Sequence, residues 1–135
     1  MSFARPTCRH PWRSQSGNAV VEFALVLPIL FLLVFGITEF GRALMTSNVL
    51  YSAAREGARL AAIGSDAAAV TARVNEVLDA ASVEDAGRSI TVTGPGVGRT
   101  VTVAVQADFA VLTAQVLSLP SIIRLGASTA MRSEL

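Results

Sequence analysis

The residues that could do acid–base or nucleophilic chemistry are few and scattered along the 135-residue chain. The chain has one histidine, His10, and one cysteine, Cys8. A catalytic triad needs a base held beside its nucleophile, and a structural zinc site needs several nitrogen or sulfur ligands. Several carboxylates stand apart from one another, as on a solvated surface: Glu76, Asp79, Glu84, Asp85 and Asp108. We therefore expect no enzyme, no cofactor, no metal site and no small-molecule substrate.

Two other carboxylates differ because they border an apolar run, Phe23 to Thr38, that contains no charged residue. A carboxylate in apolar surroundings is costly unless it is paired or neutralised. Glu39 has Arg42 three residues further on, and this spacing predicts a local ion pair on a helix. Glu22 has two interpretations. It is a solvated carboxylate at a membrane interface, or it meets a positive partner in a helix bundle, such as an α-amino group created by a cut just before Asn18.

The apolar run itself predicts a membrane anchor. Residues 18–40 give the roughly 20 helical residues that a bilayer core of about 30 Å requires. The preceding residues 1–17 form a leader with arginine but no acidic residue, which predicts an N-terminus in the cytoplasm. A cleaved secretory signal, with a mature N-terminus near Gly41, is a weaker alternative because no Ala-x-Ala pattern closes the run. The net charge of +1 gives no reason to expect nucleic acid as a partner.

Residues 41–63 are expected to continue the same helix outside the membrane. Ala53, Gly57 and Ala61 recur every fourth residue and form a ridge of small side chains, against which a second backbone can pack closely. Gly64 and Ser65 are expected to stop this helix and to cap the next one.

Residues 64–135 are expected to form a small α+β extracytoplasmic domain. Apolar residues at helical spacing predict an amphipathic second helix over 66–82, docked on a core or, as the alternative, on a partner (Val70, Val74, Val77, Leu78 and Ala81). Alternating apolar residues predict strands near 90–93, 101–109 and 123–131. The predicted fold is thus a membrane-anchored α+β protein with one long N-terminal helix, a second helix and a three-stranded antiparallel sheet.

Two segments carry a family resemblance. The run from Gly17 through Asn18 and Glu22 to Phe23, followed by an apolar helix, resembles the processing site of type IV prepilins and pseudopilins. The run VEFALVLP from Val21, together with AAREGAR over residues 53–59, resembles the TadE-like family, the minor pseudopilins of bacterial Tad (Flp) pilus systems.

The resemblance implies a pilin-like protein that a prepilin peptidase cuts between Gly17 and Asn18. Glu22, with Phe23 beside it, would then serve recognition and assembly. It further implies a single-pass protein of the bacterial inner membrane, in contact with lipid, other pilin or pseudopilin subunits and the Tad machinery. The alternative is an uncleaved bitopic anchor whose external domain binds an envelope partner.

Overall fold

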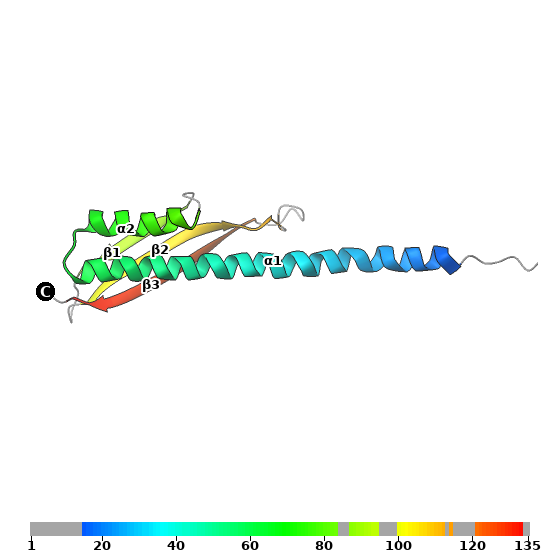
Figure 1. Ribbon diagram of the computed structural model, residues 1–135, viewed down its shortest axis with the longest axis horizontal. Coiled ribbons are helices and arrows are strands. Elements are labelled where there is room, and N and C mark those ends of the chain that lie inside the picture. The colour runs from blue at the N-terminus through cyan, green and yellow to red at the C-terminus, as the bar shows by residue number, and fades with distance from the viewer. Residues whose placement is uncertain (1–14, 84–86, 95–99, 113, 115–120, 134–135) are drawn as a thin grey trace, which may run out of the picture. The chain divides into compact units, whose positions relative to one another are not determined.

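The structure, a computed structural model, describes residues 15–83, 87–94, 100–112, 114 and 121–133 (Figure 1). The described residues form two helices and three strands in the order α1, α2, β1, β2, β3. This confirms the predicted long N-terminal helix, second helix and three-stranded antiparallel sheet. Contacts divide the chain within α1 into two units, Met1–Val34 and Phe35–Leu135. Most of the predicted leader, with Cys8 and His10, lies outside the described residues.

Helix α1 comprises Gln15–Ala62 and continues past Pro28. It therefore begins three residues before Asn18, inside the segment predicted as leader. Its end is a glycine stop: Gly64 has φ +86°, which favours glycine. The N–H of Gly64 donates to the carbonyl of Ala61, and the N–H of Ser65 donates to that of Leu60, both at 3.2 Å. These two bonds satisfy carbonyls that the helix end would otherwise leave unpaired.

Helix α2 comprises Ala67–Ala80, and its N-cap is Asp66 and not Ser65 as expected. The Asp66 carboxylate accepts the N–H of Ala69 at 2.9 Å, while the N–H of Ser65 is already used at the end of α1. Ala81 was expected on the apolar face, but it is the exposed C-cap residue. The buried face of α2 consists of Val70, Val74 and Leu78.

The sheet has the order β1-β2-β3 and is antiparallel throughout, with β1 Ser89–Thr93, β2 Thr100–Ala110 and β3 Ile122–Arg132. Central strand β2 shows the expected alternation, because one of its faces is covered by helices and the other is not. Its buried residues are Val101, Val103, Val105, Ala107 and Phe109. Residues 95–99, between β1 and β2, lie outside the described residues.

One core holds the second unit together, formed where α1 and α2 pack on the same face of the sheet (Figure 1). Helix α1 contributes mostly small residues, so that its backbone lies close to the other elements: Leu50, Ala53, Ala54, Ala58 and Ala61. Edge strand β3 is only partly covered: Ile123 lies on the same face of the sheet as the buried Phe109, and yet it is exposed, as is Ile122. The alternation along the strand predicts which residues share a face but not how far the helices cover it.

Candidate functional site

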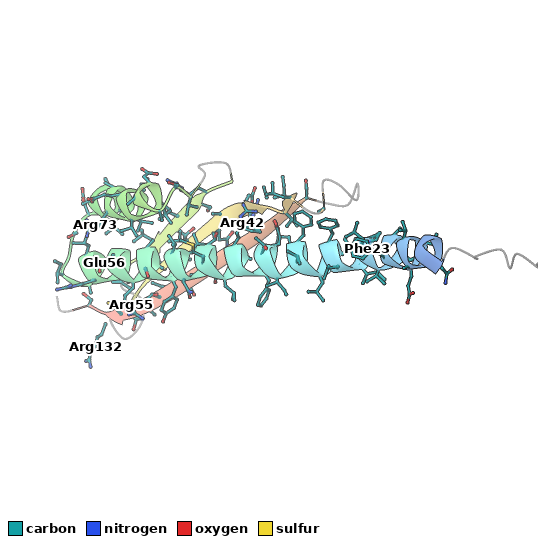
Figure 2. The ribbon with its side chains drawn as sticks, turned by 45° about the vertical axis from the view of Figure 1, so that its right-hand side comes forward. Phe23, Arg42, Arg55, Glu56, Arg73 and Arg132 are labelled. Carbon is teal, nitrogen blue, oxygen red and sulfur yellow. The ribbon has the colours of Figure 1, made fainter. Side chains whose placement is uncertain are left out.

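The segment that carries the predicted cleavage and recognition residues lies on the first turns of α1. Gly17, Asn18, Glu22 and Phe23 are all exposed, and Figure 2 shows Phe23 standing out from the ribbon. Asn18 and Glu22 are four residues apart and so share one face of the helix. A Cβ built on Gly17 would have no atom within 4 Å to contact. The role of these residues in processing and assembly stays a prediction.

Glu22 has no hydrogen bond or ion pair with another described residue. Glu39, the other carboxylate beside the apolar run, has both an ion pair and a hydrogen bond, and the two carboxylates therefore differ in kind. Packing within the first unit does not account for the charge at Glu22. Any partner for it therefore lies outside the described residues of this chain.

The apolar side chains of α1 between these carboxylates are exposed, apart from the partly buried Leu27. Those at least half exposed include Val26, Ile29, Phe31, Leu33 and Ile37. Within the described residues, α1 is the one helix long and apolar enough to cross a membrane, over Gly17–Ala62. The helix is thus compatible with a single-pass membrane anchor. Water would be a poor environment for this surface, because apolar area left in water forfeits about 25 cal/mol per Å².

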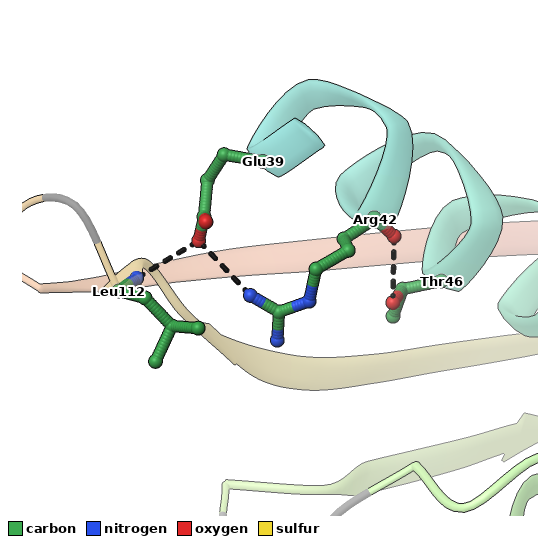
Figure 3. A network of polar contacts seen from close by, with 4 residues as sticks. All are labelled: Glu39, Arg42, Thr46 and Leu112. Atoms are coloured by element: carbon green, nitrogen blue, oxygen red, sulfur yellow. Dashed lines mark hydrogen bonds and ion pairs between the residues drawn. The ribbon is translucent and has the colours of Figure 1, made fainter. Parts of the chain in front are cut away.

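Glu39 forms the predicted ion pair with Arg42, with 3.2 Å between Oε1 and the guanidinium, which confirms the expected i,i+3 contact (Figure 3). The same oxygen accepts the backbone N–H of Leu112 at 2.8 Å. The guanidinium of Arg42 also lies 5.2 Å from the ring centroid of Phe109. Helix α1 is therefore fastened to the end of β2 by one carboxylate and one arginine.

Sequence reasoning missed the bond between Glu39 and Leu112. The two residues are 73 positions apart, and no periodicity connects them. The only available hint was a carboxylate on a helix that was expected to pack on a folded domain, since a charge that becomes buried needs partners. In the structure the Glu39 side chain is 14% exposed.

The ridge of small residues faces inward within the second unit. Ala53 and Ala61 belong to the core, and Gly57 is buried beside them. A Cβ on Gly57 would stand 2.6 Å from Val74 Cγ2 and 3.2 Å from Val103 Cγ1. Real Cβ atoms do not approach other atoms as closely as 2.6 Å. The second backbone packed at this ridge is thus the chain's own α2, with β2 behind it.

The charged residues of the AAREGAR segment point away from that core. Arg55 is exposed, and its guanidinium lies 5.1 Å from the ring centroid of Tyr51. Glu56 lies 3.9 Å from Arg73 of α2, and Figure 2 shows the two at neighbouring positions. The pKa of Arg73 is raised by its hydrogen bond to Glu76 and by the negative charge of that residue, with a smaller effect from Glu56. This segment thus combines a small, buried face with a charged outer face.

Among the residues that the structure describes, no three histidine, cysteine or acidic side chains come together as metal ligands would. No curated protein and no solved structure was found to match the chain. Residues 17–59 do match a family profile, that of the TadE-like protein family. The match begins at the glycine before the predicted cut and ends with the AAREGAR segment. From Gly17 to Arg59 the chain is thus similar to the TadE-like family, over the apolar part of α1 and the part of α1 that packs into the folded unit.

Proposed function

We propose that this chain is a minor pseudopilin-like component of a bacterial Tad (Flp) pilus or related secretion system. A prepilin peptidase cuts it between Gly17 and Asn18, and α1 holds it in the inner membrane with the N-terminus in the cytoplasm. One observation carries the proposal: the TadE-like match starts at Gly17 and includes Glu22. The protein is structural, and its partners are the peptidase, other pilin or pseudopilin subunits and the Tad machinery of the inner membrane.

Local helix physics supports a special role for Gly17. Glycine in a helix interior costs about 1 kcal/mol relative to alanine, and nothing packs so closely on Gly17 that a side chain would be excluded. The residue lies in the first turn of α1, where N–H groups have no intrahelical acceptor. The bond after Gly17 is thus at a place where the helix opens at low cost, as a peptidase that binds an extended strand would require.

The charge at Glu22 supports the assembly role. A carboxylate within a bilayer costs on the order of 2.5–3.5 kcal/mol at the centre and less toward the interface. Cleavage before Asn18 creates an amine at the N-terminal end of the same helix face. In an array of parallel helices, the amine of one subunit meets the carboxylate of the next and offsets that cost.

Mass spectrometry of the full chain extracted from membranes tests the cleavage. In cells that contain a prepilin peptidase, we expect Asn18 as the mature N-terminus. The Gly17→Leu variant should keep its leader, because the side chain blocks recognition and not folding. Gly36→Leu is the matched control, since Gly36 also lies in α1 with no atom within 4 Å of a built Cβ. An intact leader in the unmodified protein would favour the uncleaved bitopic anchor.

Replacement of Glu22 tests the assembly role separately. Glu22→Ala should still be cut and should remain in the membrane, yet it should cross-link to neighbouring pilin subunits at a several-fold lower yield. Glu22→Asp keeps the charge and should recover part of that yield. Equal cross-linking by Glu22→Ala and the unmodified protein would leave Glu22 with an interfacial role only.

A further inference from the structure

One end of the second unit carries large apolar side chains that the core does not use. Where β2 finishes and β3 begins, Leu112 is 55% exposed, Ile122 is 64% exposed and Ile123 is 52% exposed. Ile122 pairs with Ala110 and Ile123 pairs with Phe109, so the two isoleucines project to opposite faces of the sheet. Both faces of the sheet are therefore apolar at this end, which a core on one face does not explain.

The rest of β3 shows how local this feature is. The other residues on the face of Ile122 are small or polar: Arg124, Gly126, Ser128, Ala130 and Arg132. That pattern is ordinary for a face in water. The change to a large apolar residue occurs only at the first position of the strand.

Helix α1 extends the apolar surface at the same end of the unit. Glu39 is tied to Leu112 by a hydrogen bond, and Arg42 lies over Phe109, the partner of Ile123. The residues of α1 before this point are apolar and exposed. We define the apolar end as Phe35, Ile37, Phe40, Leu112, Ile122 and Ile123, all of which are at least half exposed.

We propose that the apolar end rests in the interface of the lipid bilayer, as a membrane contact of the folded unit in addition to the spanning helix. The proposal relies on α1 spanning a membrane, as proposed above. Lipid is the occupant because three residues of the apolar end, Phe35, Ile37 and Phe40, belong to the last part of the proposed span, residues 18–40. Single exposed apolar residues are ordinary, but a contiguous group marks a contact surface.

The charges at the border of the apolar end fit the same partner. Arg42 and Arg124 are partly exposed, at 45% and 65% of their side chains. Each is also held in place by a carboxylate, Glu39 or Asp108. Arginine with an apolar stem and an exposed head suits the headgroup layer, where it meets lipid phosphates.

Collisional quenching in liposomes tests the contact with the full chain. Single cysteines are introduced in a Cys8→Ser background, labelled with an environment-sensitive fluorophore, and reconstituted in phosphatidylcholine–phosphatidylglycerol vesicles with shallow spin-labelled lipid as quencher. Ile123→Cys reports the apolar end, and Val26→Cys reports insertion of the helix. Ser128→Cys is the control for the rest of the strand: it is exposed, lies on the face of Ile122, and stands about 17 Å further along than Ile123 at roughly 3.3 Å per residue.

We expect blue-shifted, lipid-quenched emission at position 123 and water-like, unquenched emission at position 128. Quenching at 26 without quenching at 123 overturns the lipid contact and leaves the membrane span intact. Failure of quenching at 26 overturns the span itself, and the lipid contact with it. A blue shift at 123 that disappears on dilution with more lipid assigns the surface to a second copy of the chain and also refutes the proposal.

Lipid quenching of a fluorophore on Ile122→Cys provides a second, independent measurement. Its side chain lies on the opposite face of the sheet, where the other residues of β3 are small or polar. A lipid interface surrounds both faces of a strand end, so position 122 should be quenched as position 123 is. A protein partner docked on the helix side of the sheet would protect 123 alone, and that result would contradict the proposal.

Discussion

Replacement of Gly57 by alanine tests how closely α1 packs on α2 and β2. The added Cβ would stand 2.6 Å from Val74 Cγ2 and 3.2 Å from Val103 Cγ1. Both valines are fully buried, and β-branched side chains have little rotamer freedom with which to move away. Overpacking of this kind costs about 1–3 kcal/mol. Against it, alanine gains up to about 1 kcal/mol over glycine in a helix.

The matched control removes the helix-propensity contribution from the comparison. Gly41 lies in the same helix, and a Cβ there meets nothing within 4 Å. Gly41→Ala should therefore stabilise the protein by about 1 kcal/mol, as helix propensity predicts. The difference between the two variants is then the packing cost alone, about 1–3 kcal/mol, which corresponds to roughly 5- to 150-fold in an equilibrium constant.

Hydrogen–deuterium exchange of the β2 amides in detergent measures this difference. Strand β2 packs against Gly57, so its protection factors report the opening of the core. We expect Gly57→Ala to lower the protection of β2 relative to Gly41→Ala by the fold-change above. Equal protection in the two variants would refute the close approach of α2 to α1 and would leave the small-residue ridge available for another chain.

Two further stability predictions concern polar contacts. Glu39→Ala removes the ion pair with Arg42 and the acceptor for the Leu112 N–H, and should lower the free energy of unfolding by about 1 kcal/mol, whereas Glu39→Gln keeps an acceptor and should cost less. The hydrogen-exchange protection of the Leu112 amide distinguishes the two variants. If that protection were unchanged in Glu39→Ala, the result would count against the hydrogen bond between Glu39 and Leu112. Asp66→Ala removes the N-cap of α2 and should cost about 1 kcal/mol in chemical unfolding, with Asp66→Ser close to the unmodified protein; indifference to both changes would contradict the capping role.

Local chemistry along the chain predicted most of the elements. The uncharged run after Glu22 indicated a long apolar helix, and alternation around Val101, Val103 and Val105 indicated a strand with one buried face. The Glu39–Arg42 pair followed from helix geometry alone, since residues three apart are neighbours on any helix. Such features depend only on the period of the backbone.

Other features depend on which surfaces meet, and these needed the tertiary structure. Ser65 and Asp66 are both good N-cap residues, and the cap is Asp66, whose carbonyl accepts the N–H of Val70 and whose carboxylate accepts the N–H of Ala69. Strand periodicity assigned Ile123 to the face of the core, yet the helices do not cover that end of β3.

The residues of α1 that were candidates for function also fall into these two groups, those predicted from the sequence and those that needed the tertiary structure. The sequence by itself determined that a glycine and a glutamate stand five residues apart at the start of an apolar helix, and the TadE-like match covers both that pattern and AAREGAR. Only the tertiary structure decided that Gly57 packs against its own chain, and that Glu39 binds Leu112. A pattern of residue types specifies what a surface would bind, but contacts between distant segments decide which surfaces remain uncovered.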